Sequence, residues 1–96
     1  MAAFFVGAGM IKDMAAFQEY SAGTPATFAL FGGEILTRGG KSHDLTGSGG
    51  ADMVIVVRFK DMETLDAWYA SDEYQALLPL REKALDLTIT AYNEPS

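Results

Sequence analysis

The chain has 96 residues, of which 49% are hydrophobic and 21% charged, a balance typical of one globular domain over residues 1–96. Its net charge is −6 and its cations are scattered, so we expect no nucleic-acid partner, because phosphate binding needs clustered Lys and Arg. The absence of cysteine excludes disulfides and fits a cytoplasmic location. The apolar run at residues 1–11 is too short to cross a bilayer and lacks a signal peptide's basic region, so we expect no membrane association.

Four segments have the patterns of β-strands. Residues 4–10 are uniformly apolar, which predicts a strand buried on both faces. Residues 53–59 are β-branched and apolar on both faces until Arg58, so they give the clearest strand. Residues 34–38 are mixed in polarity, and residues 86–92 alternate between apolar and polar side chains. The first and third strands are therefore expected at the centre of the sheet and the other two at its edges.

Capping residues predict the helices between these strands. Asp13 is placed to cap a first helix, and the Gly-Thr-Pro sequence at residues 23–25 is expected to interrupt it and start a second piece. Asp61 and Ser71 are cap signals for two further segments. Pro79 should bend or restart the last one, because proline removes a backbone donor from the helix.

The resulting order, βαββαβ, predicts a ferredoxin-like α+β fold with a four-stranded antiparallel sheet and the helices on one face. The other face would be bare, and the strand at residues 53–59 is apolar on both sides. An apolar face of that size is unusual on a monomer, so we expect a homodimer, a dimeric α+β barrel, in which two sheets pack face to face. A monomer with its bare face covered by the tail is the alternative, although only residues 93–96 remain to cover it.

Several segments of the chain are similar to a known family. They are Phe31-Gly32-Gly33 before the second strand, Arg38-Gly39-Gly40 after it, and the run from Ala67 to Gln75 followed by Pro79-Leu80-Arg81. Over essentially the whole chain, these residues resemble domain of unknown function 1330 (DUF1330), a family of dimeric α+β barrel proteins. The resemblance implies a small, soluble dimer of undetermined role, related by fold to monooxygenases, isomerases and dismutating enzymes that act without a metal or with haem. A shared fold of this kind does not establish a shared activity.

Two arginines are candidate anion-binding residues. Arg81 could hold a carboxylate or enolate oxygen through a bidentate pair, with an ion pair to a neighbouring carboxylate as the alternative. Arg38 leaves a strand just before two glycines, where the backbone can approach a ligand closely. A solvated arginine on an edge strand is the alternative for Arg38.

His43, the only histidine, is the candidate general base and forms the candidate catalytic pair with Arg81. A surface histidine on the hairpin is the alternative. We expect no metal site at His43 and Asp44, because adjacent residues on a strand point to opposite faces.

Three tyrosines complete the candidate site. Tyr20, Tyr69 and Tyr74 combine rings with hydroxyl groups, and an apolar pocket with a few convergent polar groups is the usual form of a small-ligand site. Packing in an aromatic core is the alternative for each of them.

Three functions stay open at this point. The first is an enzyme that transforms a small organic molecule in the cleft between sheet and helices without a cofactor. The second is a dimer that binds such a ligand without chemistry, and the third is a purely structural dimer. No cofactor or metal is expected, and haem is the weakest of the alternatives.

Overall fold

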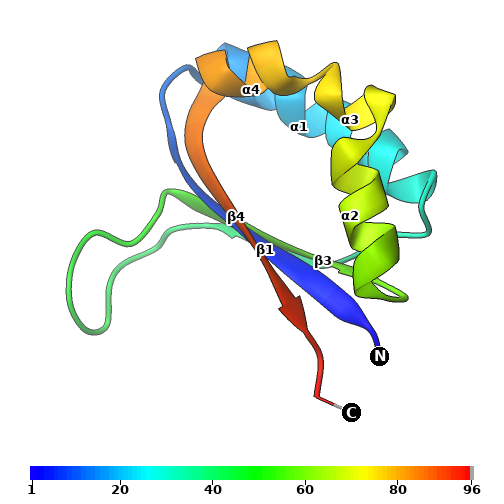
Figure 1. Cartoon of the computed structure of the whole chain (residues 1–96). Helices are drawn as coiled ribbons and strands as arrows, with labels where there is room; N and C mark the ends of the chain where they lie inside the picture. Colours follow the sequence, from blue (N-terminus) through cyan, green and yellow to red (C-terminus); the bar gives the residue numbers. More distant parts are fainter. Residues whose placement is uncertain (96) are drawn as a thin grey trace.

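The computed structural model describes residues 1–95. In chain order its elements are β1 (Ala3–Ile11), α1 (Met14–Ala29), β2 (Glu34–Gly40), β3 (Met53–Phe59), α2 (Met62–Ala70), α3 (Asp72–Gln75), α4 (Leu78–Ala84) and β4 (Leu85–Asn93). The helices form a layer that arches over one face of a twisted sheet, and the opposite face carries no helix (Figure 1). The predicted ferredoxin-like α+β fold is confirmed.

The sheet has the strand order β2-β3-β1-β4, and all neighbouring strands are antiparallel. The two strands that are apolar on both faces, β1 and β3, are therefore central, as their sequences predict. Phe5 lies opposite Val57, and both side chains are buried on the face that the helices cover. Val6 lies opposite Val56, on the bare face. We call these two surfaces the inner and the outer face of the sheet.

Aromatic side chains fill one half of the space between the inner face and the helices. Trp68 of α2 is 1% exposed and stacks on Phe5, with ring centroids 4.8 Å apart and an interplanar angle of 8°. Phe28 and Phe59 lie next to it, with centroids 5.3 and 5.8 Å from that of Trp68. The indole N–H donates to Oγ1 of Thr27 at 3.0 Å, so the polar atom of this buried ring is satisfied.

The expected break at residues 23–25 does not occur, because α1 runs without interruption from Met14 to Ala29 with Pro25 inside it. Proline cannot donate a hydrogen bond to the carbonyl four residues earlier, which is that of Ser21. The Thr24 hydroxyl instead donates to the carbonyl of Ser21 at 3.3 Å. This side-chain bond replaces the one that Pro25 cannot make, and it explains why the helix continues.

The predicted caps of the other helices are confirmed. Asp61 accepts from the Thr64 N–H at 2.8 Å, and this hydrogen bonding lowers the pKa of Asp61 below its ordinary value. The Ser71 hydroxyl accepts from the Tyr74 N–H at 3.2 Å and starts α3. Pro79 lies in the first turn of α4, where its missing donor costs little. Three short helices, α2, α3 and α4, thus follow β3, as the two cap signals and Pro79 predict.

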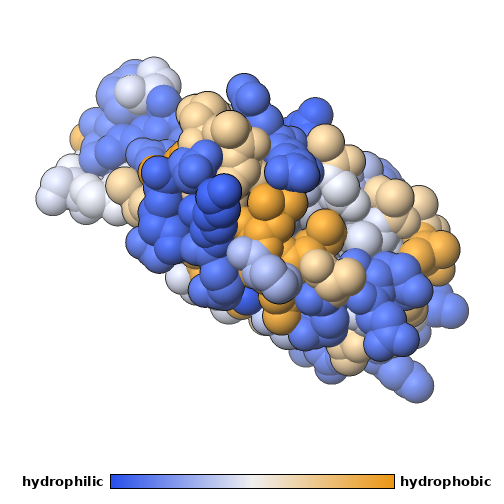
Figure 2. Space-filling model, turned by 90° about the horizontal axis from the view of Figure 1, so that it is seen from above, coloured by the Kyte–Doolittle hydropathy of each residue, from blue (hydrophilic) through white to orange (hydrophobic). Residues whose placement is uncertain are grey.

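The outer surface of the helical layer is mostly hydrophilic, with a smaller hydrophobic area near its centre (Figure 2). No helix within residues 1–95 is long and apolar enough to cross a membrane.

The loop between β2 and β3 extends away from the rest of the molecule (Figure 1).

Candidate functional site

A cavity of about 440 Å³ lies between α1 and the inner face of the sheet. Most of its lining is apolar, and the residues come from α1, from all four strands, from Trp68 and from the start of β3. They are Phe5, Gly7, Ile11, Phe17, Tyr20, Ser21, Thr24, Phe28, Arg38, Gly39, Gly40, Asp52, Met53, Val54, Ile55, Trp68, Leu87 and Ile89. We call this space the main cavity.

The main cavity exists because the side chains of the sheet fill little of the space beneath α1. Gly7 faces inward two residues after Phe5 on β1, and because it has no side chain, the side chains of Ile55 and Leu87 lie close to the backbone there. A Cβ atom at Gly7 would lie 3.0 Å from Cγ2 of Ile55, close to the inner face. Helix α1 packs mainly against α4 rather than down onto the strands. The hollow is therefore a consequence of both the sequence of β1 and the helix packing.

A smaller cavity of about 280 Å³ adjoins the main one toward β4. It shares Trp68, Leu87 and Ile89 with the main cavity, and Tyr69 and Arg81 lie on its wall. The inner face is thus hollow on both sides of these shared residues.

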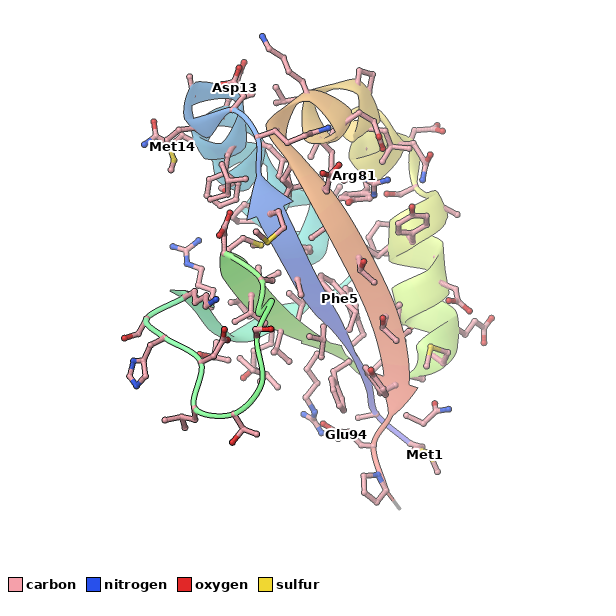
Figure 3. The ribbon with its side chains drawn as sticks, turned by 90° about the vertical axis from the view of Figure 1, so that its left-hand side faces the viewer. Met1, Phe5, Asp13, Met14, Arg81 and Glu94 are labelled. Carbon is pink, nitrogen blue, oxygen red and sulfur yellow. The ribbon has the colours of Figure 1, made fainter. Side chains whose placement is uncertain are left out.

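Four of the predicted site residues form one hydrogen-bonded group, which we call the tyrosine–arginine cluster: Tyr20, Tyr69, Tyr74 and Arg81. The hydroxyl oxygens of Tyr20 and Tyr74 are 2.7 Å apart. Nη1 of Arg81 donates to the Tyr74 hydroxyl at 3.1 Å and to the Tyr69 hydroxyl at 3.3 Å. Because these residues come from α1, α2, α3 and α4, the cluster connects all four helices by hydrogen bonds. Figure 3 labels Arg81 beside the helices and Glu94 at the other end of the molecule, near Met1.

Arg81 is a largely buried charge with a weak counter-ion. Its side chain is 15% exposed, and its ion pair is with Glu82 at 3.4 Å, whose own side chain is 72% exposed. Asp86, another carboxylate near Arg81 in the sequence, pairs with Lys12 instead. Burial acts to lower the pKa of Arg81, but hydrogen bonds to Tyr69 and Tyr74 outweigh it and raise the pKa above its ordinary value. The guanidinium therefore keeps its charge and can stabilise negative charge nearby.

Tyr20 places a phenol group between the cluster and the main cavity. It is 7% exposed and lies on the wall of the main cavity. Burial, followed by the neighbouring Tyr74, raises the pKa of Tyr20 well above its ordinary value. The hydroxyl thus stays protonated and acts as a hydrogen-bonding group rather than as a base.

The remaining predicted residues, Arg38 and His43, lie outside the tyrosine–arginine cluster. Arg38 of β2 lines the main cavity and is at the same time exposed to solvent. His43 is exposed in the loop between β2 and β3, where Nδ1 is 2.9 Å from the Ser42 hydroxyl. It does not line either cavity. A single chain thus brings the predicted arginines and tyrosines to the two cavities or the cluster between them, and leaves His43 apart.

Asp52 is a cavity residue that the sequence analysis missed. It lies just before β3 and lines the main cavity, and its Oδ2 atom accepts from the backbone N–H of Ile11 at 2.9 Å. A lone carboxylate between a glycine-rich loop and a doubly apolar strand was the signal that could have pointed to it. Within residues 1–95, no three His, Asp or Glu side chains lie close enough together to hold a metal ion. The expectation of no metal or cofactor stays a prediction.

Residues 2–94 match the family model described as "Domain of unknown function (DUF1330)". The chain belongs to the DUF1330 family. The resemblance in the segments around Gly32, Gly39 and Trp68 is thereby confirmed. A comparison with curated proteins finds no significant match.

Solved structures share the fold of this DUF1330 protein at low sequence identity. A protein of unknown function from Rhodopseudomonas palustris has a TM-score of 0.84 at 13% identity, over 99% of this chain and 83% of its own. A dimeric ferredoxin-like protein of unknown function from Jannaschia sp. has a TM-score of 0.79 at 12% identity, over 98% and 100%. SnoaB from Streptomyces nogalater, described as a cofactor-independent oxygenase, has a TM-score of 0.73 at 14% identity, over 99% and 94%. At these identities the similarity establishes the fold alone.

Proposed function

We propose that this DUF1330 protein binds a small, mainly aromatic organic molecule in the main cavity between sheet and helices. The observation that carries the proposal is the cavity itself, an apolar hollow of about 440 Å³ with a few polar groups on its wall. This volume falls within the range of pockets that hold small organic ligands. Phe17, Trp68 and Leu87 offer apolar contact to a ring, and Tyr20, Arg38 and Asp52 offer hydrogen bonds to its substituents.

The only tryptophan of the chain makes this proposal testable without a label. Trp68 lies on the wall of the main cavity, so a bound aromatic compound should change its fluorescence. We would titrate the protein with a panel of phenols, naphthols and aromatic carboxylates and follow the Trp68 emission. Saturable changes with at least one of these classes are expected.

A matched pair of variants separates binding in the cavity from binding elsewhere. Ser21 lines the main cavity on α1, whereas its neighbour Ala22 is exposed. Ser21→Phe fills the cavity and is expected to abolish the saturable change, whereas Ala22→Phe adds the same ring outside and should leave it intact. Equal binding by the two variants would mean that the ligand lies elsewhere and would overturn the proposal.

We also propose that two copies associate through the outer faces of their sheets. Val6 and Val56 lie opposite each other on this face, and Val54 and Tyr92 remain well exposed on it in a single chain. Burying such a surface against a second copy removes apolar area from water. The Jannaschia neighbour is described as dimeric, which supports the association of two copies.

Sedimentation measurements test the association. The wild-type chain is expected to sediment as a dimer at micromolar concentration, and Val56→Lys should produce monomers by placing a charge at the centre of the contact. Ala22→Lys, on the exposed side of α1, is the matched control and should remain dimeric. A monomeric wild-type chain would contradict the proposal.

Chemical transformation of the bound molecule without a cofactor is the second candidate function. Two observations favour it: Arg38 and Asp52 add charged groups to the cavity wall, and the fold is shared with SnoaB, described as a cofactor-independent oxygenase. In this candidate Arg81 or Arg38 stabilises an anion, and His43 or a tyrosine transfers a proton. Since His43 lies outside the cavity of its own chain, it would have to act on the partner subunit's cavity.

Product analysis distinguishes this candidate from binding alone. A compound selected by the Trp68 titration is incubated with the protein in air and analysed by mass spectrometry. Recovery of unchanged compound would support binding alone. Turnover that survives in a His43→Ala, Arg81→Ala double variant would remove the mechanism based on these two residues.

A further inference from the structure

The tyrosine–arginine cluster has a direction, which follows from counting its hydroxyl protons. The Arg81 guanidinium can only donate hydrogen bonds, so the Tyr74 oxygen accepts at 3.1 Å from Nη1. The Tyr74 hydroxyl is fully buried and still has its own proton to place. Its other hydrogen-bond partner in the described part of the chain is the Tyr20 oxygen at 2.7 Å. Either direction leaves one hydroxyl proton without an acceptor among the described residues. This costs more at Tyr74, which is 0% exposed and lines neither cavity, than at Tyr20, which lies on the wall of the main cavity.

The favoured arrangement is therefore a donor chain from Arg81 through Tyr74 to Tyr20. In this series of hydrogen bonds the Tyr20 oxygen accepts from Tyr74, and the Tyr20 proton has no acceptor of its own. Within residues 1–95, no further hydrogen bond engages the Tyr20 hydroxyl. Because Tyr20 lies on the wall of the main cavity, a ligand oxygen there can accept this proton in a hydrogen bond.

We propose that Tyr20 is the ligand-facing end of this donor chain and that the main cavity prefers an aromatic ligand with an anionic oxygen, a phenolate or enolate, at Tyr20. Hydrogen bonds in a chain polarise one another, and a chain that begins at a cation presents a stronger donor at its far end. Such a donor stabilises a charged oxygen more than a neutral one. The inference rests on the proposed function, because it specifies which form of the ligand the same cavity binds.

The surroundings of Tyr20 are consistent with an anionic ligand oxygen. Burial keeps Tyr20 protonated, so the donor does not ionise in competition with the ligand. The weak ion pair between Arg81 and exposed Glu82 leaves the guanidinium charge only partly compensated. The titratable and charged groups that face Tyr20 or the same cavity are Tyr74 from α3, Arg81 with its partner Glu82 from α4, Tyr69 from α2, Arg38 from β2 and Asp52 before β3.

4-Nitrophenol is a suitable probe, because its phenol and phenolate forms absorb at different wavelengths. Binding is measured by Trp68 fluorescence, and the form of the bound probe is measured by absorbance during a pH titration. The wild-type protein is expected to lower the pKa of the bound probe, with the phenolate bound about tenfold more tightly than the phenol. Tyr20→Phe removes the contact, and Tyr74→Phe or Arg81→Met cuts the chain behind it, so each variant should lose most of this preference.

Two controls separate the donor chain from other effects. Tyr92→Phe makes the same chemical change on the outer face of the sheet and should keep the preference. Arg38→Met tests the other cavity cation, which acts through space; its loss should weaken binding without removing the dependence on Tyr74. Tyr20→Phe leaves the bond between Arg81 and Tyr74 in place, so it remains informative if Tyr74→Phe folds poorly.

The outcomes distinguish the two proposals. If 4-nitrophenol changes the Trp68 fluorescence but its pKa stays the same or rises, the donor chain is wrong and the binding proposal stands. A preference for phenolate that persists in Tyr20→Phe and Arg81→Met also overturns the chain. If neither 4-nitrophenol nor any compound of the panel binds, the proposed function fails and this inference fails with it.

Discussion

The inner face of the sheet has a filled end around Phe5 and Phe59 and a hollow end beneath α1, although the same strands form both. Trp68 lies on the boundary between the two ends, and the smaller cavity lies beside β4. Phe5, Phe59 and Trp68 are almost fully buried and stack closely at the filled end. Beneath α1, by contrast, Ile55 and Ile89 remain partly exposed to the main cavity. Phe5 and Gly7 are two residues apart on the same face of β1, so one change of side-chain size separates a packed core from a binding site.

The largest expected effect comes from truncating side chains at the two ends. Phe59→Ala at the filled end is expected to lower the free energy of unfolding by about 3–5 kcal/mol, because it opens a new cavity. Ile89→Ala at the hollow end should cost no more than about 2 kcal/mol, because one side of Ile89 already faces empty space. Urea denaturation measures both, and equal costs would mean that the two ends are packed alike.

Adding one methyl group at each end should give a contrast in the same direction, with the larger cost at the filled end. A Cβ atom at Gly33 would lie 2.8 Å from the Phe59 ring and 3.1 Å from Cβ of Phe28, both in the filled half. Gly33→Ala is therefore expected to destabilise the protein by about 1–3 kcal/mol. At Gly7 the nearest atom is Cγ2 of Ile55 at 3.0 Å, a methyl next to Cβ of a stiff side chain, so Gly7→Ala should also destabilise the protein. The cost should be lower, about 1 kcal/mol, because Ile55 borders the main cavity and has space to shift. A larger penalty at Gly7 than at Gly33 would reverse the comparison.

A smaller effect is expected where α1 forms the roof of the hollow half. Thr24→Val removes the hydroxyl that donates to the Ser21 carbonyl and should cost about 1 kcal/mol. In a Pro25→Ala background the backbone N–H is restored to the helix, so the same Thr24→Val change should cost close to nothing. A double-mutant cycle by thermal or urea denaturation measures the difference. If the effects of Thr24→Val and Pro25→Ala on stability were additive, the explanation of why α1 continues past Pro25 would be wrong.

The smallest expected effect is at alkaline pH and concerns Tyr20, which lies between the two halves. Burial raises the pKa of Tyr20 in the folded state above the value of about 10 in the unfolded chain. Above that pH the unfolded chain has lost a proton that the folded state retains, so this stability contribution is present below pH ~10 and is lost as pH rises. The stability gap between wild type and Tyr20→Phe should therefore narrow in alkaline urea titrations. A gap independent of pH would contradict the assigned shift.

The sequence predicts the filled half and the strand order well, because both depend on local patterns. Doubly apolar runs place β1 and β3 at the centre of the sheet, and Asp61 and Ser71 mark helix starts through their own hydrogen bonds. The Tyr and Arg residues of the cluster could be chosen by residue type. Their meeting point could not, because it depends on how four helices pack.

The hollow half is harder to predict, because it depends on which space the side chains leave unfilled and on contacts between residues far apart in the sequence. Gly7 suggests close approach in the sequence, but whether a neighbour fills that space depends on where α1 lies. The expected break before Pro25 is wrong because a single threonine hydroxyl supplies the missing bond. His43 matches a general base by residue type, but it lies in a loop that extends away from the rest of the molecule and lines neither cavity. Asp52 lies at the cavity because β3 pairs with both β1 and β2, which brings its carboxylate to the Ile11 N–H.

A crystal structure of the protein soaked with 4-nitrophenol tests the central claim most directly. We expect the ring to lie in the hollow half, between Phe17 of α1 and Leu87 of β4, with its oxygen within hydrogen-bond distance of the Tyr20 hydroxyl. A ring bound on the outer face of the sheet, or a hollow half closed by rearranged side chains, would contradict the account.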